Sequence, residues 1–158
     1  MAKQTKQWAA IIMMIALFAM IAFVTNLCSP MATIVKNQFG ASELAGQIGN
    51  YANFIAYLVM GIPSGMLIAK FGYKKTALLA LIVGLVGIGF EYLSGVAGSY
   101  WIYLIGAFIS GLCMCMLNTV VNPLLNVLGG GGKTGNQLIQ IGGAFNSASA
   151  VAVYILMG

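Results

Sequence analysis

Three asparagines interrupt an otherwise apolar segment, Cys115-Met116-Leu117-Asn118-Thr119-Val120-Val121-Asn122-Pro123-Leu124-Leu125-Asn126. Their spacing of four residues places Asn118, Asn122 and Asn126 along one face of a helix, with a drift of about 40° per step. An amide in hydrocarbon without a partner is costly, so this face must meet protein, water or a solute. Pro123 adds an acceptor, because its missing N–H frees the carbonyl four residues back. The stripe predicts a solute pathway; the alternative is a ladder of hydrogen bonds that only holds helices together.

The composition is that of an integral membrane protein. Of the 158 residues, 61% are hydrophobic and 6% are charged, whereas a soluble domain carries about 25% charged residues. At about 20 residues per crossing plus short loops, the chain has room for about five or six membrane spans.

Charged and reactive side chains are few. The chain contains seven lysines and only two acidic residues, Glu43 and Glu91, so its net charge is +5. The lysines separate apolar runs, which marks them as topology signals and argues against nucleic-acid binding. Without histidine or aspartate, acid–base chemistry has almost no groups to use, so we expect no enzyme activity and no cofactor. The three cysteines lie inside apolar segments, and their odd number argues against a disulfide framework.

The apolar runs predict an all-α fold of five transmembrane helices. The first run is too long for a signal-peptide core and has no small-residue cleavage site, so we expect it to be retained. Ser42 and Glu43 are typical of a helix start. The expected spans are residues 8–35, 44–71, 76–93, 100–128 and 136–158.

The first span carries a second polar face. Asn26, Ser29 and Thr33 share one side of this helix, and Pro30 frees the carbonyl of Asn26 as an additional acceptor. The alternative is a proline kink stabilised by local hydroxyl groups. Near the end of the third span, Glu91 is expected to be a surface carboxylate that reaches the outer interface.

Lysine placement predicts the orientation. With a cytoplasmic N-terminus, only Lys36 falls in an outer loop. The inner segments then hold Lys3, Lys6, Lys70, Lys74, Lys75 and Lys133. This bias follows the positive-inside rule, so we expect the N-terminus in the cytoplasm.

Two motifs are better explained by structure than by chemistry. Gly132-Lys133-Thr134 lacks the glycine that a phosphate-binding loop needs five positions earlier, where Val127 stands, so we expect a flexible hinge. Cys113 and Cys115 point about 200° apart on a helix and cannot easily share a metal ion.

Three segments resemble the major facilitator superfamily. Residues 65–75, Gly-Met-Leu-Ile-Ala-Lys-Phe-Gly-Tyr-Lys-Lys, resemble the loop between its helices 2 and 3, with Ala69 at the position of an aspartate. Residues 118–129 resemble helix 4 of the fucose permease and glucose/galactose transporter group, and Ala144-Phe145-Asn146-Ser147 resembles its helix 5. Their order and spacing also match, so the resemblance covers nearly the whole chain.

The resemblance implies the N-terminal part of a secondary transporter in a bacterial inner membrane. The superfamily builds each half from six helices and binds the substrate between two halves, so five spans would be an incomplete N-terminal half. The group carries a carboxylate at the position of Asn118 and another near Ser29, both associated with proton coupling. The amide and hydroxyl found here imply that proton symport does not use this route. The expected partners are the bilayer, a small solute, and a missing second half or a second copy of the chain.

The chain is therefore interpreted as part of an alternating-access transporter for a small polar solute, in particular a sugar. Neutral amides and hydroxyls match the donors and acceptors of a sugar without fixed charge. The alternatives are a facilitator for a non-sugar solute, and a non-transporting subunit or truncated fragment that binds a partner bundle. Tyr57 is a candidate aromatic wall for the sugar ring. The predicted substrate-binding residues are Asn26, Ser29, Asn118, Asn122, Gln140 and Ser147, and the predicted gating loop holds Gly65, Lys70, Gly72, Lys74 and Lys75.

Overall fold

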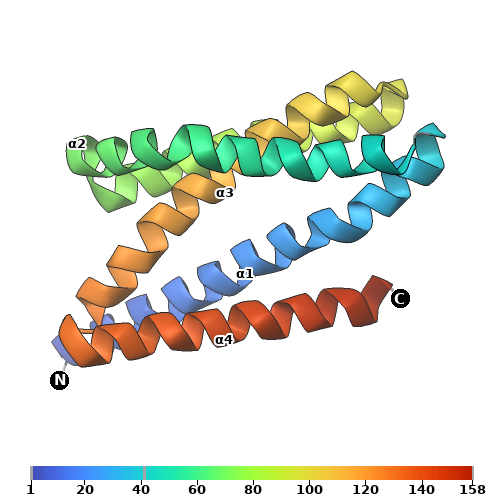
Figure 1. Cartoon of the computed structure of the whole chain (residues 1–158). Helices are drawn as coiled ribbons and strands as arrows, with labels where there is room; N and C mark the ends of the chain where they lie inside the picture. The colour runs from blue at the N-terminus through green and yellow to red at the C-terminus, as the bar shows by residue number, and fades with distance from the viewer. Residues whose placement is uncertain (1, 41, 158) are drawn as a thin grey trace. The chain divides into compact units, whose positions relative to one another are not determined.

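The computed structural model describes residues 2–40 and 42–157 as helices joined by short turns (Figure 1). The elements are α1 (Ala2–Phe39), α2 (Glu43–Ala97), α3 (Tyr100–Leu128) and α4 (Gly132–Met157). The side chains of residues 1–7, 24, 25, 27–32, 35, 39, 41, 43, 157 and 158 lie outside the description. No strand occurs among the described residues, so the all-α fold class is confirmed.

The helix α2 is too long for a single membrane crossing. Its 55 residues would extend about 80 Å as one straight helix, whereas the hydrocarbon core of a bilayer is about 30 Å thick. The helix breaks at Gly72, whose φ of 78° and ψ of 169° are open only to glycine. Figure 1 shows the chain reversing at this break, so α2 consists of two segments, residues 43–71 and 73–97.

The helix ends are set by capping residues. Ser42 begins α2, where its hydroxyl accepts a hydrogen bond of 3.4 Å from the Ala45 amide, and the expected helix start is thereby confirmed. Gly98 ends α2 in the left-handed conformation that commonly closes a helix. A run of positive-φ glycines, Gly130 to Gly132, forms the turn between α3 and α4.

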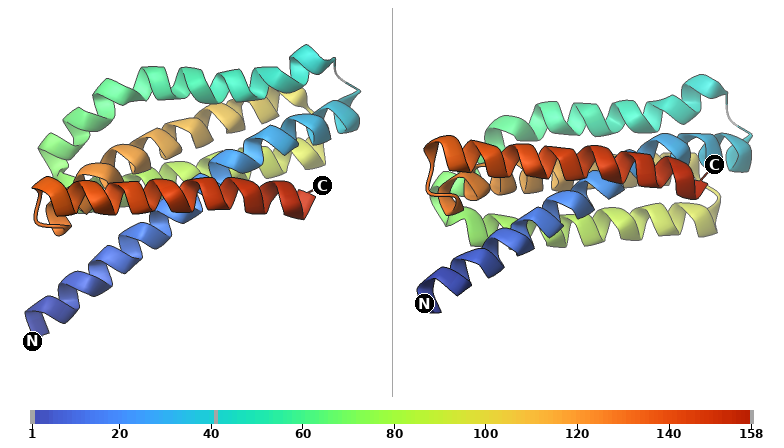
Figure 2. Two further views of the ribbon diagram at one scale, coloured as in Figure 1. Left: turned by 60° about the horizontal axis from the view of Figure 1, so that its bottom comes forward. Right: turned by 90° about the horizontal axis from the view of Figure 1, so that it is seen from below.

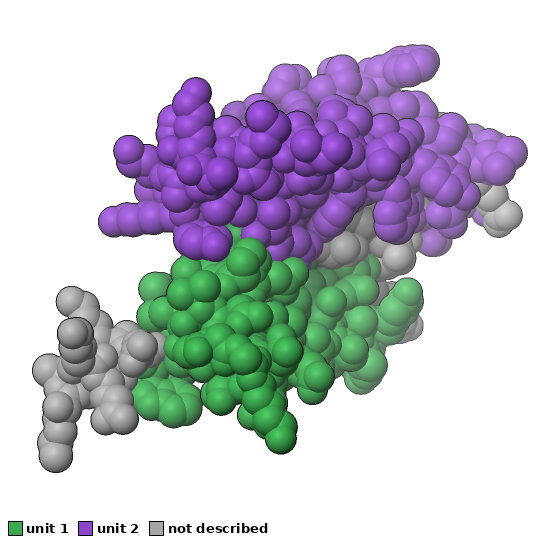
Figure 3. Space-filling model, turned by 60° about the vertical axis from the view of Figure 1, so that its left-hand side comes forward, with its two compact units in different colours: residues 1–27, 120–158 green, residues 28–119 purple. Residues whose placement is uncertain are grey.

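The chain divides into two compact units, which are described separately. One unit contains residues 28–119, and the other contains residues 1–27 and 120–158 (Figure 3). The helices α1 and α3 each pass from one unit to the other.

In the unit of residues 28–119, α3 packs against both segments of α2 (Figure 2). Glycines permit the close approach on both sides. A Cβ at Gly49 would lie 2.8 Å from the Tyr103 ring, and a Cβ at Gly87 would lie 2.8 Å from the backbone nitrogen of Ser110. The segment 43–71 runs parallel to α3 and the segment 73–97 runs antiparallel to it, because the contacting residue numbers rise together in the first case and oppositely in the second.

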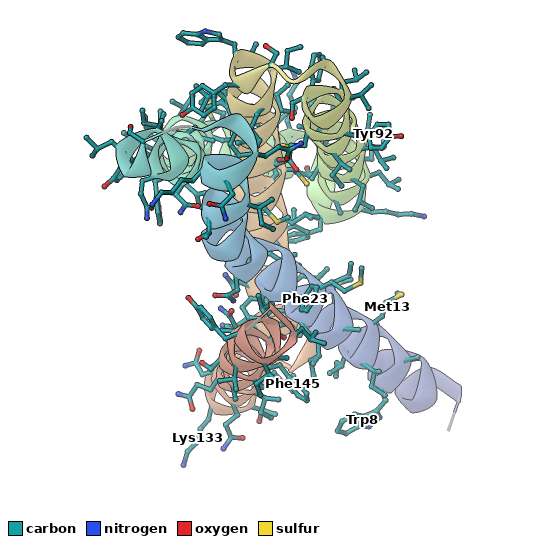
Figure 4. All side chains as sticks on the ribbon, turned by 90° about the vertical axis from the view of Figure 1, so that its right-hand side faces the viewer. Trp8, Met13, Phe23, Tyr92, Lys133 and Phe145 are labelled. Carbon is teal, nitrogen blue, oxygen red and sulfur yellow. The ribbon has the colours of Figure 1, made fainter. Side chains whose placement is uncertain are left out.

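Glu91 is not the surface carboxylate that we expected. Its oxygen Oε1 accepts a hydrogen bond of 2.9 Å from the Ser110 hydroxyl of α3. A Cβ at Gly106 would lie 2.8 Å from Glu91 Cγ, so the carboxylate sits at a close contact between the two helices. The next residue, Tyr92, instead points away from α3 (Figure 4). The expectation was wrong because a neighbouring helix supplies both the space and the donor.

In the other unit, α1 crosses α4 (Figure 2). A Cβ at Gly142 would lie 3.1 Å from the Phe18 ring, and the Ser149 hydroxyl donates to the Ala19 carbonyl at 3.5 Å. Figure 4 shows Trp8 and Met13 pointing outward from α1, where both are exposed. Gly142 therefore leaves room for the Phe18 ring, while Trp8 and Met13 face outward.

The outward surfaces are those of a multi-pass membrane protein. Three helical stretches among the described residues are long and apolar enough to cross a membrane: Leu44–Ala97, Tyr100–Leu128 and Gly132–Leu156. The first of these is divided by Gly72. Residues 8–23 form a shorter apolar helix. Large apolar side chains such as Leu58, Ile62 and Trp101 are mostly exposed, as expected for surfaces that meet lipid.

Candidate functional site

The central polar contact of α3 joins Asn118 to Tyr57 of α2. The amide nitrogen of Asn118 donates a hydrogen bond of 2.8 Å to the Tyr57 hydroxyl. Both side chains are half-buried where α2 meets α3. The amide oxygen of Asn118 takes no hydrogen bond from any described residue. Such an amide oxygen can accept a hydrogen bond from a hydroxyl group.

A chain of hydrogen bonds fixes α2 against α3 beside this pair. The buried Ser64 donates to the Thr119 hydroxyl at 3.0 Å, and the Thr119 hydroxyl donates to the Cys115 carbonyl at 2.8 Å. The Cys115 thiol lies 3.7 Å from the Tyr57 carbonyl oxygen. These bonds satisfy the buried hydroxyls and hold residues 43–71 in register with Asn118.

The two cysteines of α3 face different helical segments. Cys115 lies against residue 57 of the first segment of α2, whereas Cys113 packs on Gly84 of the second. Both are free and buried. Within the described residues, no three acidic, histidine or cysteine side chains are grouped as a metal site would require. These cysteines therefore act in helix packing.

The other two asparagines of the stripe differ in their contacts. Asn122 is half-buried and makes no hydrogen bond to any described residue. Asn126 belongs to the turn before α4: its carbonyl accepts from the Gly131 amide at 2.9 Å. A Cβ at Gly135 would lie 2.7 Å from that same carbonyl oxygen. The stripe is therefore not a uniform ladder, because each asparagine has different surroundings.

A second polar contact joins α1 to α4. The Asn26 amide donates at 2.8 Å to the Ala22 carbonyl of its own helix and lies 3.4 Å from Oδ1 of Asn146. Asn146 was not among the predicted binding residues, although it lies within the Phe-Asn-Ser segment that carried the resemblance.

Of the predicted binding residues on α4, neither Gln140 nor Ser147 takes part in the contact between Asn26 and Asn146. Gln140 and Ser147 are exposed, and the Ser147 hydroxyl donates to the Gly143 carbonyl of its own helix at 3.3 Å. The side chain of Ser29 lies outside the described residues.

The predicted gating loop forms the reversal within α2. Gly72 supplies the non-helical backbone, and Lys70, Lys74 and Lys75 are all exposed around it. Gly65 is exposed, and no described atom lies within 4 Å of its Cβ position.

The polar side chains predicted for the site are amides and hydroxyls, whereas the Glu91 carboxylate is bonded to Ser110 elsewhere. Asn118, Tyr57 and Asn122 offer both donors and acceptors without a fixed charge. Such groups bind and orient a neutral hydroxylated molecule but supply no nucleophile or base of ordinary strength. The described residues thus form a helical membrane protein in which a neutral amide and a phenol meet between α2 and α3.

The chain belongs to the Major Facilitator Superfamily, whose family model matches residues 10–158. It is similar to a putative glucose/galactose transporter of Helicobacter pylori, with 29% identity over 92% of this chain and 35% of that protein. It is also similar to a glucose/galactose transporter of Brucella abortus, with 26% identity over 83% of this chain and 32% of that protein. The L-fucose-proton symporter of Escherichia coli is 24% identical over 89% of this chain and 32% of that protein.

The chain spans about one third of the length of these relatives. No solved structure matches it. The names of these relatives are all those of transporters or symporters.

Proposed function

We propose that this chain forms one side of a sugar-binding site in an alternating-access transporter. The observation that carries the proposal is the Asn118–Tyr57 pair, a neutral amide and phenol 2.8 Å apart in an apolar helix interface. A sugar hydroxyl that reaches Asn118 can donate to its amide oxygen. Asn122, one turn further along α3, offers a second amide, and Asn26, Gln140, Ser147 and Ser29 are proposed to contribute further contacts.

A second set of helices is part of this proposal. In major-facilitator transporters the substrate lies between two helical halves that move relative to one another. We propose that such a half, or a second copy of this chain, covers the polar faces described above. Without such a cover, exposed amides such as Gln140 would meet lipid at a considerable cost in free energy.

A binding assay tests the proposed solute class. The purified chain in lipid nanodiscs is expected to bind labelled galactose saturably, and unlabelled glucose, galactose and L-fucose should displace the label. Galacturonate should displace it at least about tenfold less well, because the neutral amides cannot compensate a desolvated carboxylate. Empty nanodiscs provide the baseline. Equal displacement by galacturonate would contradict a site built for neutral sugars, and absence of saturable binding would contradict a sugar site in this chain.

We also propose that the N-terminus lies in the cytoplasm of an inner membrane, which follows from the lysine distribution. Single cysteines at Ser42 and Lys74, in a variant that lacks Cys28, Cys113 and Cys115, are expected to be labelled from opposite sides of intact cells. Both positions are exposed, so access of the reagent is not limited by packing. An impermeant thiol reagent added outside should label position 42 and leave position 74 unlabelled until the cells are opened. Labelling of position 74 in intact cells would reverse the orientation.

A further inference from the structure

Three lysines surround the reversal of α2 and form what we call the lysine turn: Lys70, Lys74 and Lys75. All three are exposed. The turn has a defined backbone, because Gly72 adopts a conformation restricted to glycine and its carbonyl accepts a hydrogen bond of 2.8 Å from Thr76. The chain thus holds three ammonium groups within a few residues of one fixed reversal.

This chain has no acidic side chain within reach of the lysine turn. Its only acids are Glu43 and Glu91. Glu43 begins α2, about 40 Å along the helix from Lys70, and Glu91 lies about 24 Å along the helix from Lys75. The carboxylate of Glu91 is also bonded to Ser110. An ion pair needs charged atoms within about 4 Å, so a partner for the three lysines must come from outside the chain.

The residues around the lysine turn indicate which kind of anion would pair with its lysines. Met66 precedes the turn and Leu78 follows it, and both are more than half exposed, so the flanking helices present apolar surface. Phe71 is 47% exposed, and the ammonium of Lys70 lies 5.6 Å from its ring centroid. Aromatic rings and lysines beside apolar helix surface are typical of the headgroup region of a bilayer. At that depth the abundant anion is the phosphodiester of a phospholipid.

We propose that the lysine turn binds the headgroups of anionic phospholipids, with Phe71 packed at the boundary between headgroup and acyl chain. This assigns the turn a lipid partner in addition to its proposed place in a gating loop, and it requires only that the chain lies in a membrane. Ammonium groups near an anionic surface each contribute to binding, so the expected preference for anionic lipid is about fivefold per lysine and on the order of a hundredfold for the turn.

The test measures lipid binding by the full chain in neutral detergent. Phosphatidylglycerol and phosphatidylcholine with identical acyl chains are added in equal amounts, and the lipids retained by the protein are counted by native mass spectrometry. The unmodified chain is expected to retain phosphatidylglycerol preferentially. In Lys70→Gln/Lys74→Gln/Lys75→Gln most of the preference should be lost, and Lys74→Gln alone should lose about fivefold. Removing lysines can change the direction in which a chain inserts into the membrane of a cell. In micelles both ends of the helices are accessible, so such a change does not affect the lipid-binding result.

The matched control is Lys133→Gln, which removes an exposed lysine from the glycine turn before α4. This variant should keep the preference of the unmodified chain. Glutamine is a good helix former, so the exposed substitutions should leave folding intact, which a circular dichroism melt checks. The proposal is overturned if the triple variant retains the preference, if Lys133→Gln loses as much, or if the unmodified chain shows no preference. Displacement of the lipid by an equal concentration of inorganic phosphate would assign the turn to a free anion and would also overturn it.

Discussion

Replacing Gly111 by alanine is expected to lower the free energy of unfolding by about 1–3 kcal/mol, the usual cost of overpacking a helix interface. Gly111 lies where α3 meets the first segment of α2. A Cβ there would meet the side-chain oxygen of Asn53, would lie 2.8 Å from the Ala56 Cβ, and would lie 3.0 Å from the Asn53 Cα. Because one contact is to the backbone, a change of rotamer cannot relieve the clash, and the two helices must separate.

Gly89→Ala is the matched control for this prediction. Gly89 also lies in a helix, but no described atom occurs within 4 Å of its Cβ position. Alanine should therefore leave stability unchanged or raise it by up to about 1 kcal/mol through its better helix propensity. Unfolding of both variants in mixed micelles of increasing denaturing detergent provides the comparison. Equal stability of Gly111→Ala and Gly89→Ala would show that the close packing of α3 on α2 is not present in the protein.

Features that depend on neighbours in sequence were largely accessible from the sequence. The all-α class follows from the apolar runs, and the start of α2 follows from the capping hydroxyl of Ser42, which reaches an amide three residues away. The turn around Gly72 was predicted from the glycine between lysines. In the structure the turn is very short, because helical residues lie on both sides of Gly72. Periodicity locates such elements because helix geometry relates residues three or four positions apart.

Features that depend on the register between helices were not accessible. Glu91 near the end of a helix was assigned to the interface with water, but its partner Ser110 lies on the next helix. Among the helical glycines, Gly84 and Gly87 contact α3, whereas Gly61, Gly65 and Gly89 have no described atom near their Cβ positions. The many glycines in the sequence indicate that some helices pack closely. Which of these glycines lie at a contact depends on the register of α2 against α3.

The candidate site shows the same limit. Asn118 could be singled out because an amide in an apolar helix needs a partner, but the identity of that partner, Tyr57, depends on how α2 packs on α3. On α4, Asn146 approaches Asn26 of α1, and Asn146, Gln140 and Ser147 are all exposed. Successive residues of a helix point about 100° apart, so which of them meets Asn26 depends on how α1 contacts α4.

Replacing Asn118 by leucine is expected to weaken sugar binding by about 1–3 kcal/mol, or roughly 5- to 150-fold, because the sugar hydroxyls lose their amide partner. Folding should suffer much less. Leucine is favourable in a membrane helix, and the single hydrogen bond lost with Tyr57 is worth about 0.6 kcal/mol on average between membrane helices. The two effects separate a solute pathway from a ladder of hydrogen bonds that only joins helices.

Tyr57→Phe is the companion variant, because it removes the hydroxyl that accepts from Asn118 but leaves the amide in place. If the pair serves only to join α2 to α3, both variants should lose similar stability and neither should change sugar binding selectively. If Asn118 contacts the solute, its replacement should reduce binding more than the replacement of Tyr57 does, at similar stability.

The decisive measurement is therefore labelled-galactose affinity and unfolding free energy determined on the same preparations of the unmodified chain, Asn118→Leu and Tyr57→Phe. A solute site on α3 predicts a loss of affinity of at least about fivefold in Asn118→Leu, with a change in unfolding free energy below about 1 kcal/mol. Unchanged affinity in Asn118→Leu, combined with a loss of stability equal to that of Tyr57→Phe, would contradict a solute-binding role for the asparagine.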